Sequence, residues 1–467
     1  GVGGSKETAV VATAAEQLGK ERADQCRKRF ASLGGERGVV DPNTVFDALG
    51  ILTTVPRVQR GWLCEAIEAE ARPPTAGAGA TVPTTSTGMT PGGFLLLMSR
   101  MASPDRDGRR ALYYNTIAPA DAAAAEAGPL EALLAAAAGE DFGGDPAVLP
   151  YFVWEALKKR GKAGNLGELE SRLTDRQFSQ FLDRCPLVEA LLNELFFPRD
   201  GFGVIERPET LETVRGGPRH IRNESGILSP AVQTVLEWAL PHGKHAEWAS
   251  LFAAKRDGAS YQRLKGNIEG KGSTILVIRD AGGHIFGGYA HASWAPHPGF
   301  FGSDHGFLFS VGPALRIYRP GGINDHFQYF CNFQQTRVNG IGFGGQFEPT
   351  PYFGLWISDQ FDAGHCKGHP LSSTYGNPVL GHADDFKVVD LEAWRVGPED
   401  RDEFEESDDE AAAAGAPGGV LGRVTNADRT MLELAGRTLH SDNLEPFADA
   451  DDKRSSRKGN VDGKPAK

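Results

Sequence analysis

The chain has 467 residues and a formal net charge of −12, and 40% of its residues are hydrophobic. That length is enough for two or three domains with at least one large core. An acidic surface repels phosphate backbones, so nucleic acid is not expected as a main partner. The cysteines, Cys26, Cys64, Cys185, Cys331 and Cys366, are odd in number and scattered, which is typical of a reducing compartment rather than a disulfide scaffold.

No apolar run approaches the roughly 20 residues of a membrane-spanning helix, and no secretory signal pattern is present. We therefore expect a cytoplasmic protein. The chain begins GVGGSK, so Gly1 and Ser5 satisfy the N-myristoylation pattern if a methionine preceded Gly1; alternatively, the numbering starts at an arbitrary cut. A single myristoyl chain anchors only marginally, so lipid attachment at Gly1 predicts peripheral membrane association that a protein partner reinforces.

Residues 1–72 are predicted to be helical, because apolar side chains recur there at helical spacing. These are Val10, Ala14, Leu18, Cys26, Phe30 and Leu33. Residues 73–150 are predicted to be rich in linkers and only partly helical. They comprise a Pro-, Gly- and Thr-rich stretch at 73–92, a short apolar helix at 93–101, and an Ala-, Gly- and Glu-rich segment at 120–144 that has little to bury.

One part of this region resembles a degenerate EF-hand. Ser103, Asp105, Asp107 and Gly108 match the start of the calcium loop, but position 12, normally a bidentate Glu, is Tyr114. Without that carboxylate, calcium affinity is expected to be largely lost. We therefore predict an EF-hand-like shape without a metal site.

Strong helix signals return at residues 151–200. Thr174 and Gln177 fit a capping box, and Pro186 marks a break between two helices. The apolar face of this region consists of Phe178, Phe181, Leu182, Val188, Leu191, Leu192 and Leu195.

The character of the chain changes near residue 226. Ser229 and Pro230 predict the start of a helix, with a side-chain oxygen at the N-cap and proline at the first position. The apolar residues that follow suggest two packed helices: Leu236, Leu240, Trp248, Leu251 and Phe252.

From residue 274 onward, short segments rich in aromatic and β-branched residues predict strands. They read TILVIR, HIFGGYAHASW, FLFSV, ALRIYR, FQYFCNF, YFGLWI and FKVVDLEAWRV. The AGG triplet at 281–283 predicts a hairpin turn between the first two. The series predicts an antiparallel two-sheet β-sandwich with flanking helices, and therefore an α+β fold overall.

The end of the chain is predicted to have little fixed structure apart from one helix. Residues 398–424 begin with an acidic run at 399–410 and continue as a Gly- and Ala-rich segment, which favours a solvated linker over a surface for a basic partner. A helix is predicted at 425–440, with Met431, Leu434 and Ala435 on one face. Residues 441–467 are predicted to be disordered.

Gly340, Gly342 and Gly345 satisfy the spacing G-x-G-x-x-G. A phosphate-binding loop of this type opens a helix, but Pro349 and Pro351 forbid a helix here and a strand is predicted next. We therefore expect no nucleotide or other cofactor. The glycines are instead expected to permit positive φ or a close approach of chains at an irregular connection.

Two groups of residues suggest other chemistry. His365, Cys366 and His369 offer zinc ligands, but a tetrahedral site needs four spaced ligands, so we predict no metal. Asn324-Asp325-His326 suggests a hydrolase triad, but no nucleophile in a recognisable context accompanies it, so we predict no catalytic residue.

Cys331 and Cys366 are the cysteines that bear on redox chemistry. A reactive thiol needs a depressed pKa and exposure. Cys331 lies in an aromatic strand and is predicted to be buried. Cys366, between a histidine and a lysine, is the better redox candidate.

Several separated segments, GGHIFGGYAHASW, FLFSV, QQTRVNGIGFGGQ, YFGLWI and VVDLEAWRVG, resemble the motifs of the TLDc domain in type, order and spacing. The resemblance covers residues 226–397. It is closest to the mTOR-associated branch of that family, in which a helical amino-terminal half precedes the domain. The motif residues, for which structural roles are expected, are Gly287, Gly288, Trp294, Gly340, Gly342, Gly344, Gly345, Gly354 and Trp356.

This resemblance implies a protein without an established catalytic mechanism. It implies binding to the vacuolar H⁺-ATPase at lysosomal or vacuolar membranes, with links to oxidative-stress resistance and to lysosomal mTOR signalling. We therefore expect a non-enzymatic adaptor. The alternatives are a scaffold that regulates mTOR signalling and a redox-active thiol protein that uses Cys366.

Overall fold

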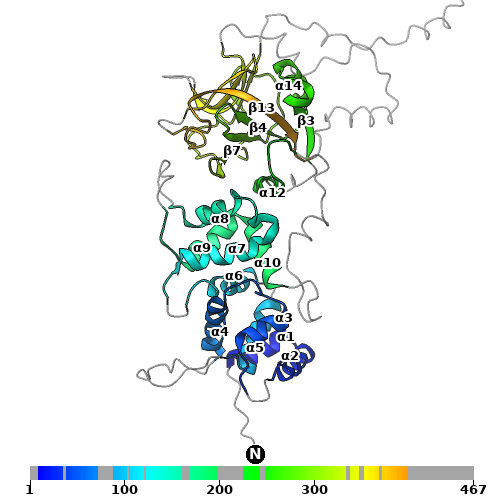
Figure 1. Cartoon of the computed structure of the whole chain (residues 1–467), viewed down its shortest axis with the longest axis vertical. Helices are drawn as coiled ribbons and strands as arrows, with labels where there is room; N and C mark the ends of the chain where they lie inside the picture. The colour runs from blue at the N-terminus through cyan, green and yellow to red at the C-terminus, as the bar shows by residue number, and fades with distance from the viewer. Residues whose placement is uncertain are drawn as a thin grey trace, which may run out of the picture. The chain divides into compact units, whose positions relative to one another are not determined.

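The structure is a computed structural model (Figure 1). It describes residues 9–34, 38–71, 88–102, 105–119, 122–159, 169–197, 225–241, 248–332, 337–346, 352–367 and 371–397. Gly1, the acidic run at 399–410, the helix predicted at 425–440 and the tail after it lie outside these residues, as does most of the stretch 73–92. Within the described residues, no helix is both long enough and apolar enough to cross a membrane.

Helices form the first part of the chain, as predicted. They are α1 (Ala9–Leu18), α2 (Lys20–Ser32), α3 (Pro42–Leu49), α4 (Arg57–Ala71) and α5 (Pro91–Ala102). Val10, one of the residues at helical spacing, is 44% exposed, and Val11 is buried instead. Val11 packs against α5 at Gly92, whose missing side chain makes room for it.

A buried carboxylate fixes the start of α5. Glu68 of α4 accepts hydrogen bonds from the Thr90 backbone N–H at 2.7 Å and from the Thr90 hydroxyl. The Thr90 hydroxyl in turn accepts from the Gly93 backbone N–H at 3.1 Å. Free N–H groups at a helix start need such acceptors, so α4 and α5 are joined through a polar contact as well as through their apolar faces.

The expected EF-hand-like loop is wrong for its described part, because those residues form helix α6 (Arg106–Asn115). Asp105 is the N-cap of α6, and its carboxylate accepts from the backbone N–H groups of Asp107 and Gly108. Tyr114 is buried, and its hydroxyl donates to the Leu173 carbonyl oxygen at 3.0 Å. Residues that would be calcium ligands in an EF-hand therefore begin a helix here.

The Ala-rich segment 120–144 buries more than expected. Most of it is helix α7 (Ala127–Gly143), in which Leu130, Leu133, Leu134 and Phe142 are buried. The spacing of these few large residues is helical, and alanines between them allow close packing against α8 (Val148–Leu157) and α10 (Pro186–Phe196). The prediction that this segment has little to bury is wrong.

The predicted capping box at Thr174 is confirmed, with the Thr174 side chain accepting from the Gln177 N–H and the Gln177 side chain accepting in return. The break at Pro186 is also confirmed, because α9 (Asp175–Arg184) ends just before it. A short strand pair, β1 (Ala125–Glu126) with β2 (Arg172–Leu173), closes this helical region.

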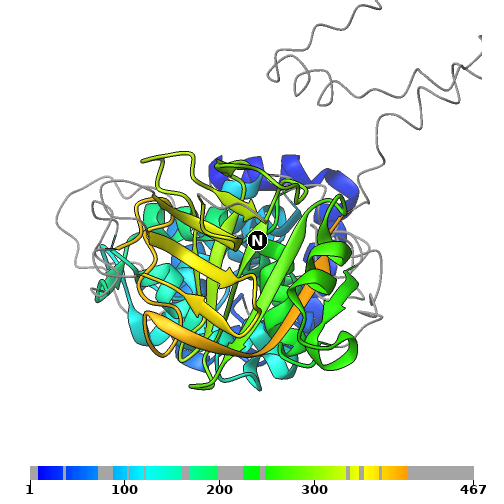
Figure 2. The same cartoon turned by 90° about the horizontal axis from the view of Figure 1, so that it is seen from above.

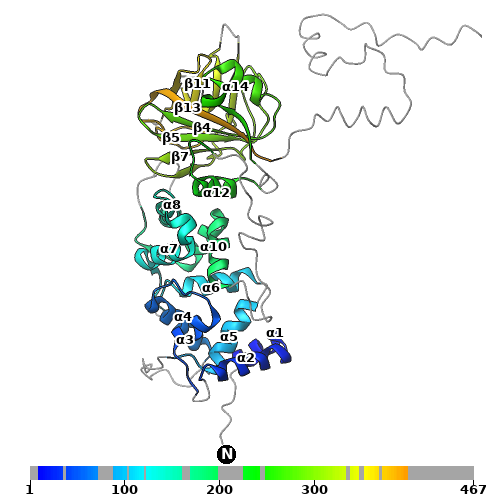
Figure 3. The same cartoon turned by 45° about the vertical axis from the view of Figure 1, so that its right-hand side comes forward.

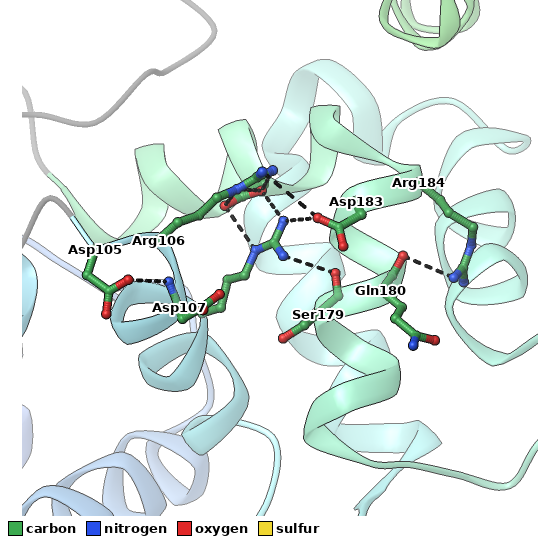
Figure 4. A network of polar contacts seen from close by, with 9 residues as sticks. Asp105, Arg106, Asp107, Ser179, Gln180, Asp183 and Arg184 are labelled. Carbon is green, nitrogen blue, oxygen red and sulfur yellow. Dashed lines mark hydrogen bonds and ion pairs between the residues drawn. The ribbon is translucent and has the colours of Figure 1, made fainter.

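Two arginines of α6 hold α9 and α10 in place (Figure 4). The Glu189 carboxylate accepts from Arg106 Nη2 at 2.6 Å and from Arg110 Nη2 at 2.8 Å. Arg110 also donates to Asp183 of α9 at 2.8 Å. Burial raises the pKa of Glu189, but the hydrogen bonds and charges of Arg106 and Arg110 outweigh burial, so its pKa is lowered.

The sandwich begins after α12 (Pro230–Ala239), whose predicted N-cap is confirmed because Ser229 accepts from the Val232 N–H. The prediction of a second packed helix is wrong. Leu251 and Phe252 belong to strand β3 (Ala249–Ala253), which pairs with β13. A short apolar run does not distinguish strand from helix, and here the open edge of β13 (Asp385–Arg395) decides for a strand.

Two short helices, α13 (Ala254–Asp257) and α14 (Tyr261–Ile268), follow β3. The remaining strands are β4 (Thr274–Asp280), β5 (Ile285–Ala290), β6 (Phe300–Phe301), β7 (Phe307–Gly312), β8 (Arg316–Tyr318), β9 (Gln328–Cys331), β10 (Gly340–Gln346), β11 (Tyr352–Ser358) and β12 (Ala363–His365). All strands predicted from residue 274 onward are present. The predicted hairpin turn is confirmed by the 3.1 Å bond from the Gly283 N–H to the Asp280 carbonyl oxygen.

The strands pair antiparallel in the order β6-β9-β10-β11-β12-β13-β4-β5-β7-β8, with β3 also on β13. This path folds into two layers that share one core (Figure 2). Leu276 and Ile278 of β4 belong to the same buried cluster as Ile341 and Phe343 of β10. The α+β fold with an antiparallel β-sandwich is therefore confirmed.

A second core lies on the other face of the β4–β5–β7 layer. Ile275, Val277 and Phe309 point away from the sandwich core and belong to the cluster that includes α12 and the helices α7 to α10. Helix α12 lies between α8 and the sheet (Figures 1 and 3). The continuous apolar run of β4 follows from this arrangement, because both faces of the strand are covered.

We predict that Glu189→Gln lowers the free energy of unfolding by about 3–5 kcal/mol, because buried Arg110 would lose its buried carboxylate and keep only the exposed Asp183. Urea unfolding followed by circular dichroism measures this change. The matched control is Asp183→Asn, whose carboxylate is 56% exposed and should cost less than about 1 kcal/mol.

The same ion pairs predict a pH dependence. A carboxyl whose pKa is lowered by folding contributes stability above its unfolded pKa, and this contribution is lost as pH falls through the folded pKa. The stability difference between the wild type and Glu189→Gln should therefore shrink at acid pH. An unchanged difference would show that Glu189 is not ionised in the folded protein.

Candidate functional site

The glycine-rich run lies in strand β10, between β9 and β11. The expectation of an irregular connection is wrong, because the glycines lie within a strand. The next described element, β11, is also a strand, which agrees with the argument against a nucleotide loop. Ile341 and Phe343 point into the sandwich core, so Gly340 and Gly342 lie on the outer face of the layer. The backbone of β10 is therefore bare on this face, and side chains of neighbouring strands can pack directly on it.

The aromatic residues of β11 pack on this bare backbone of β10. A Cβ on Gly340 would lie 2.4 Å from Trp356 Nε1, and one on Gly342 would lie 3.2 Å from Phe353 Cδ1. Gly340 also has φ of 145° and Gly345 has φ of 122°, a backbone region that side chains rarely occupy. Gly340 and Gly342 therefore allow a close approach of chains, and Gly340 and Gly345 have positive φ, as predicted.

Aromatic rings gather on this outer face. Phe353 lies 5.0 Å from Tyr329, 5.8 Å from Phe300 and 6.1 Å from Trp356, measured between ring centroids. The Phe300 ring also stacks on His326 at 4.5 Å. We call this set, Phe300, His326, Tyr329, Phe353 and Trp356, the aromatic face.

The aromatic face combines buried and accessible groups. Tyr329 and Phe353 are buried, whereas Phe300 and Trp356 are half-buried and Val338 beside them is 44% exposed. The Tyr329 hydroxyl donates to the Val338 carbonyl oxygen at 2.7 Å, and burial raises its pKa. The Trp356 indole N–H has no hydrogen-bond acceptor among the described residues. Rings with an apolar body and a polar tip are typical of protein-binding surfaces.

The other family-motif residues support the two layers. A Cβ on Gly288 would lie 2.9 Å from the Phe343 ring of the opposite layer, and one on Gly287 would lie 1.9 Å from the Leu276 carbonyl oxygen. The Trp294 ring is fully buried, and its N–H donates to the Thr274 hydroxyl at 2.6 Å. These residues set the spacing of the sandwich and take no part in an accessible site.

Gly344 and Gly354 also allow close contacts. A Cβ on Gly344, whose φ is 63°, would lie 2.9 Å from the Tyr375 ring, and one on Gly354 would lie 3.0 Å from the Ser372 hydroxyl oxygen. Both contacts involve the segment after β12, which closes one side of the second layer. Which segment these glycines contact could not be predicted from the sequence.

Two buried carboxylates tie segments to the sandwich that are distant in sequence. Asp280 accepts from the His284 N–H and from both the N–H and the ring of His382, at 2.8–2.9 Å. Burial raises its pKa, but these hydrogen bonds outweigh burial and the pKa is lowered. Glu392 accepts from the Ser225 hydroxyl at 2.5 Å and the Gly226 N–H at 2.7 Å. Neither carboxylate was predicted from the sequence, because each is identified only by its partners.

The residues that suggested a hydrolase triad instead form hydrogen bonds that hold loops together. The Asn324 side-chain oxygen accepts from the His326 N–H and the Thr374 hydroxyl, and the His326 ring bonds the Gly345 carbonyl oxygen at 2.7 Å. These bonds position His326 against Phe300 and connect it to the end of β10. The group therefore helps to shape the aromatic face.

The zinc candidates do not converge among the described residues. His365 pairs with Asp385 at 2.7 Å, whereas Cys366 faces the core, where its thiol donates to the Ala383 carbonyl oxygen. His369 lies outside the described residues. No group of three or more histidine, cysteine or acidic side chains in the described part of the chain is arranged to hold a metal ion.

Both redox candidates are buried. Burial of Cys331 was predicted and is confirmed. The exposure that Cys366 would need is absent, because its side chain is fully buried and burial raises the pKa of its thiol. Both properties are the opposite of those of a reactive cysteine, and the neighbouring charged residues in the sequence did not reveal them.

Comparison with known protein families identifies this sandwich. Residues 221–397 match the family described as the TLDc domain. The chain contains a TLDc domain. The resemblance of its glycine and aromatic motifs is therefore confirmed, and the matched segment contains α12, every strand from β3 to β13 and the aromatic face.

Relatives of the chain include MTOR-associated protein MEAK7 from Danio rerio, 39% identical over 231 residues, and from Homo sapiens, 33% identical over 231 residues. The first alignment covers 48% of each protein, and the second covers 49% of this chain and 47% of the human protein. Oxidation resistance protein 1 from Rattus norvegicus is 27% identical over 169 residues, which are 36% of this chain and 19% of that protein. The chain thus spans about half the length of the MEAK7 relatives it matches.

We predict that Gly287→Ala destabilises the TLDc domain by about 1–3 kcal/mol or more, because the new methyl group would overlap a backbone oxygen in the core. Thermal unfolding measures the change. Gly266→Ala is the matched control. It lies within α14 with nothing near the position of its Cβ, so it should stabilise by about 0.5–1 kcal/mol. Equal effects at the two positions would contradict the packing role of Gly287.

Proposed function

We propose that the protein is a non-enzymatic TLDc regulatory protein that acts in mTOR signalling and oxidative-stress resistance. We further propose that it does so by binding the vacuolar H⁺-ATPase at lysosomal or vacuolar membranes. The observation that supports the regulatory role is the similarity to MTOR-associated proteins, which covers about half of the chain. The similarity to oxidation resistance protein 1 supports the link to oxidative stress. The pump as partner comes from the family resemblance alone.

The aromatic face is the binding surface that this proposal assigns. A few aromatic residues in the centre of an interface often carry most of its binding energy. Trp356 is half-buried, so part of this large side chain is accessible to a partner. Phe353 contacts both Trp356 and Phe300, and Asn324 holds His326 against the Phe300 ring, so little side-chain ordering is needed on binding.

Membrane association would come from two weak contributions. A myristoyl group on Gly1 would supply one, and binding to a membrane-bound complex would supply the other. Linked weak contacts raise the overall affinity without any strong single site. The protein would then lie in the cytoplasm, peripherally associated with the lysosomal or vacuolar membrane.

The non-enzymatic role is supported by what the candidate catalytic groups do. Among the described residues, Asn324 and His326 bond backbone and side-chain groups of neighbouring loops, and Cys366 is enclosed in the core. Each group thus has a structural explanation that needs no reaction.

We predict that the tagged full chain recovers proton-pump subunits from solubilised lysosomal membranes, as measured by quantitative mass spectrometry. Trp356→Ala should lower the recovery about tenfold or more, as expected for the central residue of an interface. The control is Val389→Ala, an exposed apolar residue on the β13 bulge, and it should bind as the wild type does. Failure of the folded wild-type chain to recover the pump would remove the pump from the proposal.

The second candidate function is a scaffold for mTOR pathway proteins. The similarity to the MTOR-associated MEAK7 proteins favours it. The same affinity experiment distinguishes the two, because recovery of mTOR pathway proteins without pump subunits would favour the scaffold.

The redox alternative predicts a fast-reacting thiol at Cys366. We expect the opposite, because burial raises its pKa and excludes the reagent. Labelling of the native protein with a maleimide at neutral pH should modify Cys366 much more slowly than free cysteine. Labelling as fast as free cysteine, together with loss of stress protection in Cys366→Ser, would restore the redox alternative.

A further inference from the structure

Positive side chains gather where α8 meets the end of the sheet at β8. Lys158 and Arg184 come from the helical region, and Arg316 and Arg319 come from β8 and the residue just after it. The Trp154 ring lies under two of them, with Arg316 Cζ at 4.2 Å and Lys158 Nζ at 4.7 Å from the ring centroid. Cation–π contacts of this length hold both groups close to the same ring.

Only one carboxylate among the described residues pairs with this group. Glu155 is buried, and its two oxygens accept from Lys158 Nζ at 2.7 Å and from Arg184 Nε at 2.9 Å. Arg316 and Arg319 donate to the backbone carbonyl oxygens of Leu315 and Ala239, at 2.6 and 2.9 Å. Four cations and one carboxylate leave an excess of three positive charges, in a chain whose net charge is −12.

Holding these charges together has an electrostatic cost. Burial lowers the pKa of Lys158, although Glu155 partly compensates, and burial also lowers the pKa of Arg316. Tyr151 of α8 is buried, and it interacts electrostatically with both Arg184 and Arg319. Arg184 also repels Lys158, and Glu155 is the one carboxylate that pairs with them among the described residues.

The cluster is accessible to a ligand from solvent. Arg319 is exposed, and the side chains of Lys158 and Arg184 retain 28% and 23% exposure. An anion that enters would meet ammonium and guanidinium groups from both sides. Planar guanidinium groups bind phosphate oxygens through paired hydrogen bonds, and ammonium groups add point charges.

We propose that Lys158, Arg184, Arg316 and Arg319 form a binding site for a compact polyanion that carries several phosphate ester groups. Lys158 and Arg316 share the Trp154 ring, and Lys158 and Arg184 share the Glu155 carboxylate. Such close spacing suits a small, densely charged group better than an extended acidic peptide. Such groups occur on soluble inositol phosphates and on phosphoinositide headgroups. The site is separate from the aromatic face and does not depend on the partner proposed for it.

A bound polyanion would connect the helical region to the TLDc domain. Lys158 and Arg184 belong to the first, and Arg316 and Arg319 belong to the second. Binding would neutralise the excess charge that their contact creates, so the ligand should stabilise the folded chain by an amount that rises with the logarithm of its concentration above the dissociation constant. The consequence is a ligand-dependent rise in the temperature of unfolding.

The direct test is isothermal titration calorimetry of the full chain with inositol hexakisphosphate at low salt. We expect one molecule bound per chain, with an affinity that falls as salt rises. Arg319→Gln should weaken binding tenfold or more, because it removes an exposed guanidinium without disturbing the Glu155 pairs. Lys158→Gln should also weaken it.

The matched control is Lys387→Gln, which removes one exposed positive charge on β13, four places from β8 in the strand order. It should leave the affinity unchanged within twofold. Two results would overturn the proposal: no binding by the folded wild-type chain to either source of phosphate, or equal weakening by Lys387→Gln and Arg319→Gln.

Vesicles distinguish the two sources of the phosphate groups. Vesicles that contain phosphatidylinositol bisphosphate are compared with phosphatidylserine vesicles of equal charge. Preferential capture on the phosphoinositide vesicles, lost in Arg319→Gln, assigns the site to a lipid headgroup. Binding of inositol hexakisphosphate without such capture assigns it to a soluble ligand.

Discussion

The β4–β5–β7 layer is buried on both faces, and the described helices and strands are arranged around it. Along β4, Leu276 and Ile278 face the other layer of the sandwich, and Ile275 and Val277 face α12 and the helical region. Hydrophobic burial scales with the apolar area removed from water, so neither face of this layer can be exposed without a large loss. The helical region therefore covers the TLDc domain as part of the same fold.

Polar contacts then select one arrangement among those that apolar burial would allow. Glu68, Glu189, Asp280 and Glu392 are each buried or nearly so, and each accepts hydrogen bonds from a segment distant in sequence. A buried carboxylate is stable only when its partners are in place. These groups act as fixed points between α4 and α5, between α6 and α10, and between the sheet and the segments around it. The excess of positive charge around Trp154 is the exception, and that exception motivates the polyanion site.

The glycine motif shows how a structural feature creates a surface. Glycines in β10 allow the rings of Phe353 and Trp356 to lie on the backbone. The rings then remain together on the outer face, where Phe300 and His326 join them. A pattern that resembles a nucleotide-binding loop in sequence thus serves to assemble aromatic groups. This explains why the residues that resemble the family motifs are mostly internal, with Trp356 at the edge of solvent.

Features that depend on neighbouring residues could be predicted from the sequence. The caps at Thr174 and Ser229, the break at Pro186 and the strands from residue 274 onward follow from local hydrogen bonding, proline geometry and side-chain shape, and the motif resemblance located the domain. Features that depend on distant partners are seen only in the folded chain. Residues 249–253 became a strand because β13 had an open edge, and β10 became one because β9 and β11 flank it. The enclosure of Cys366, the carboxylate contacts of Glu189 and the meeting of Lys158 with Arg316 belong to the same class, because burial and charge pairing are set by residues that lie far apart along the chain.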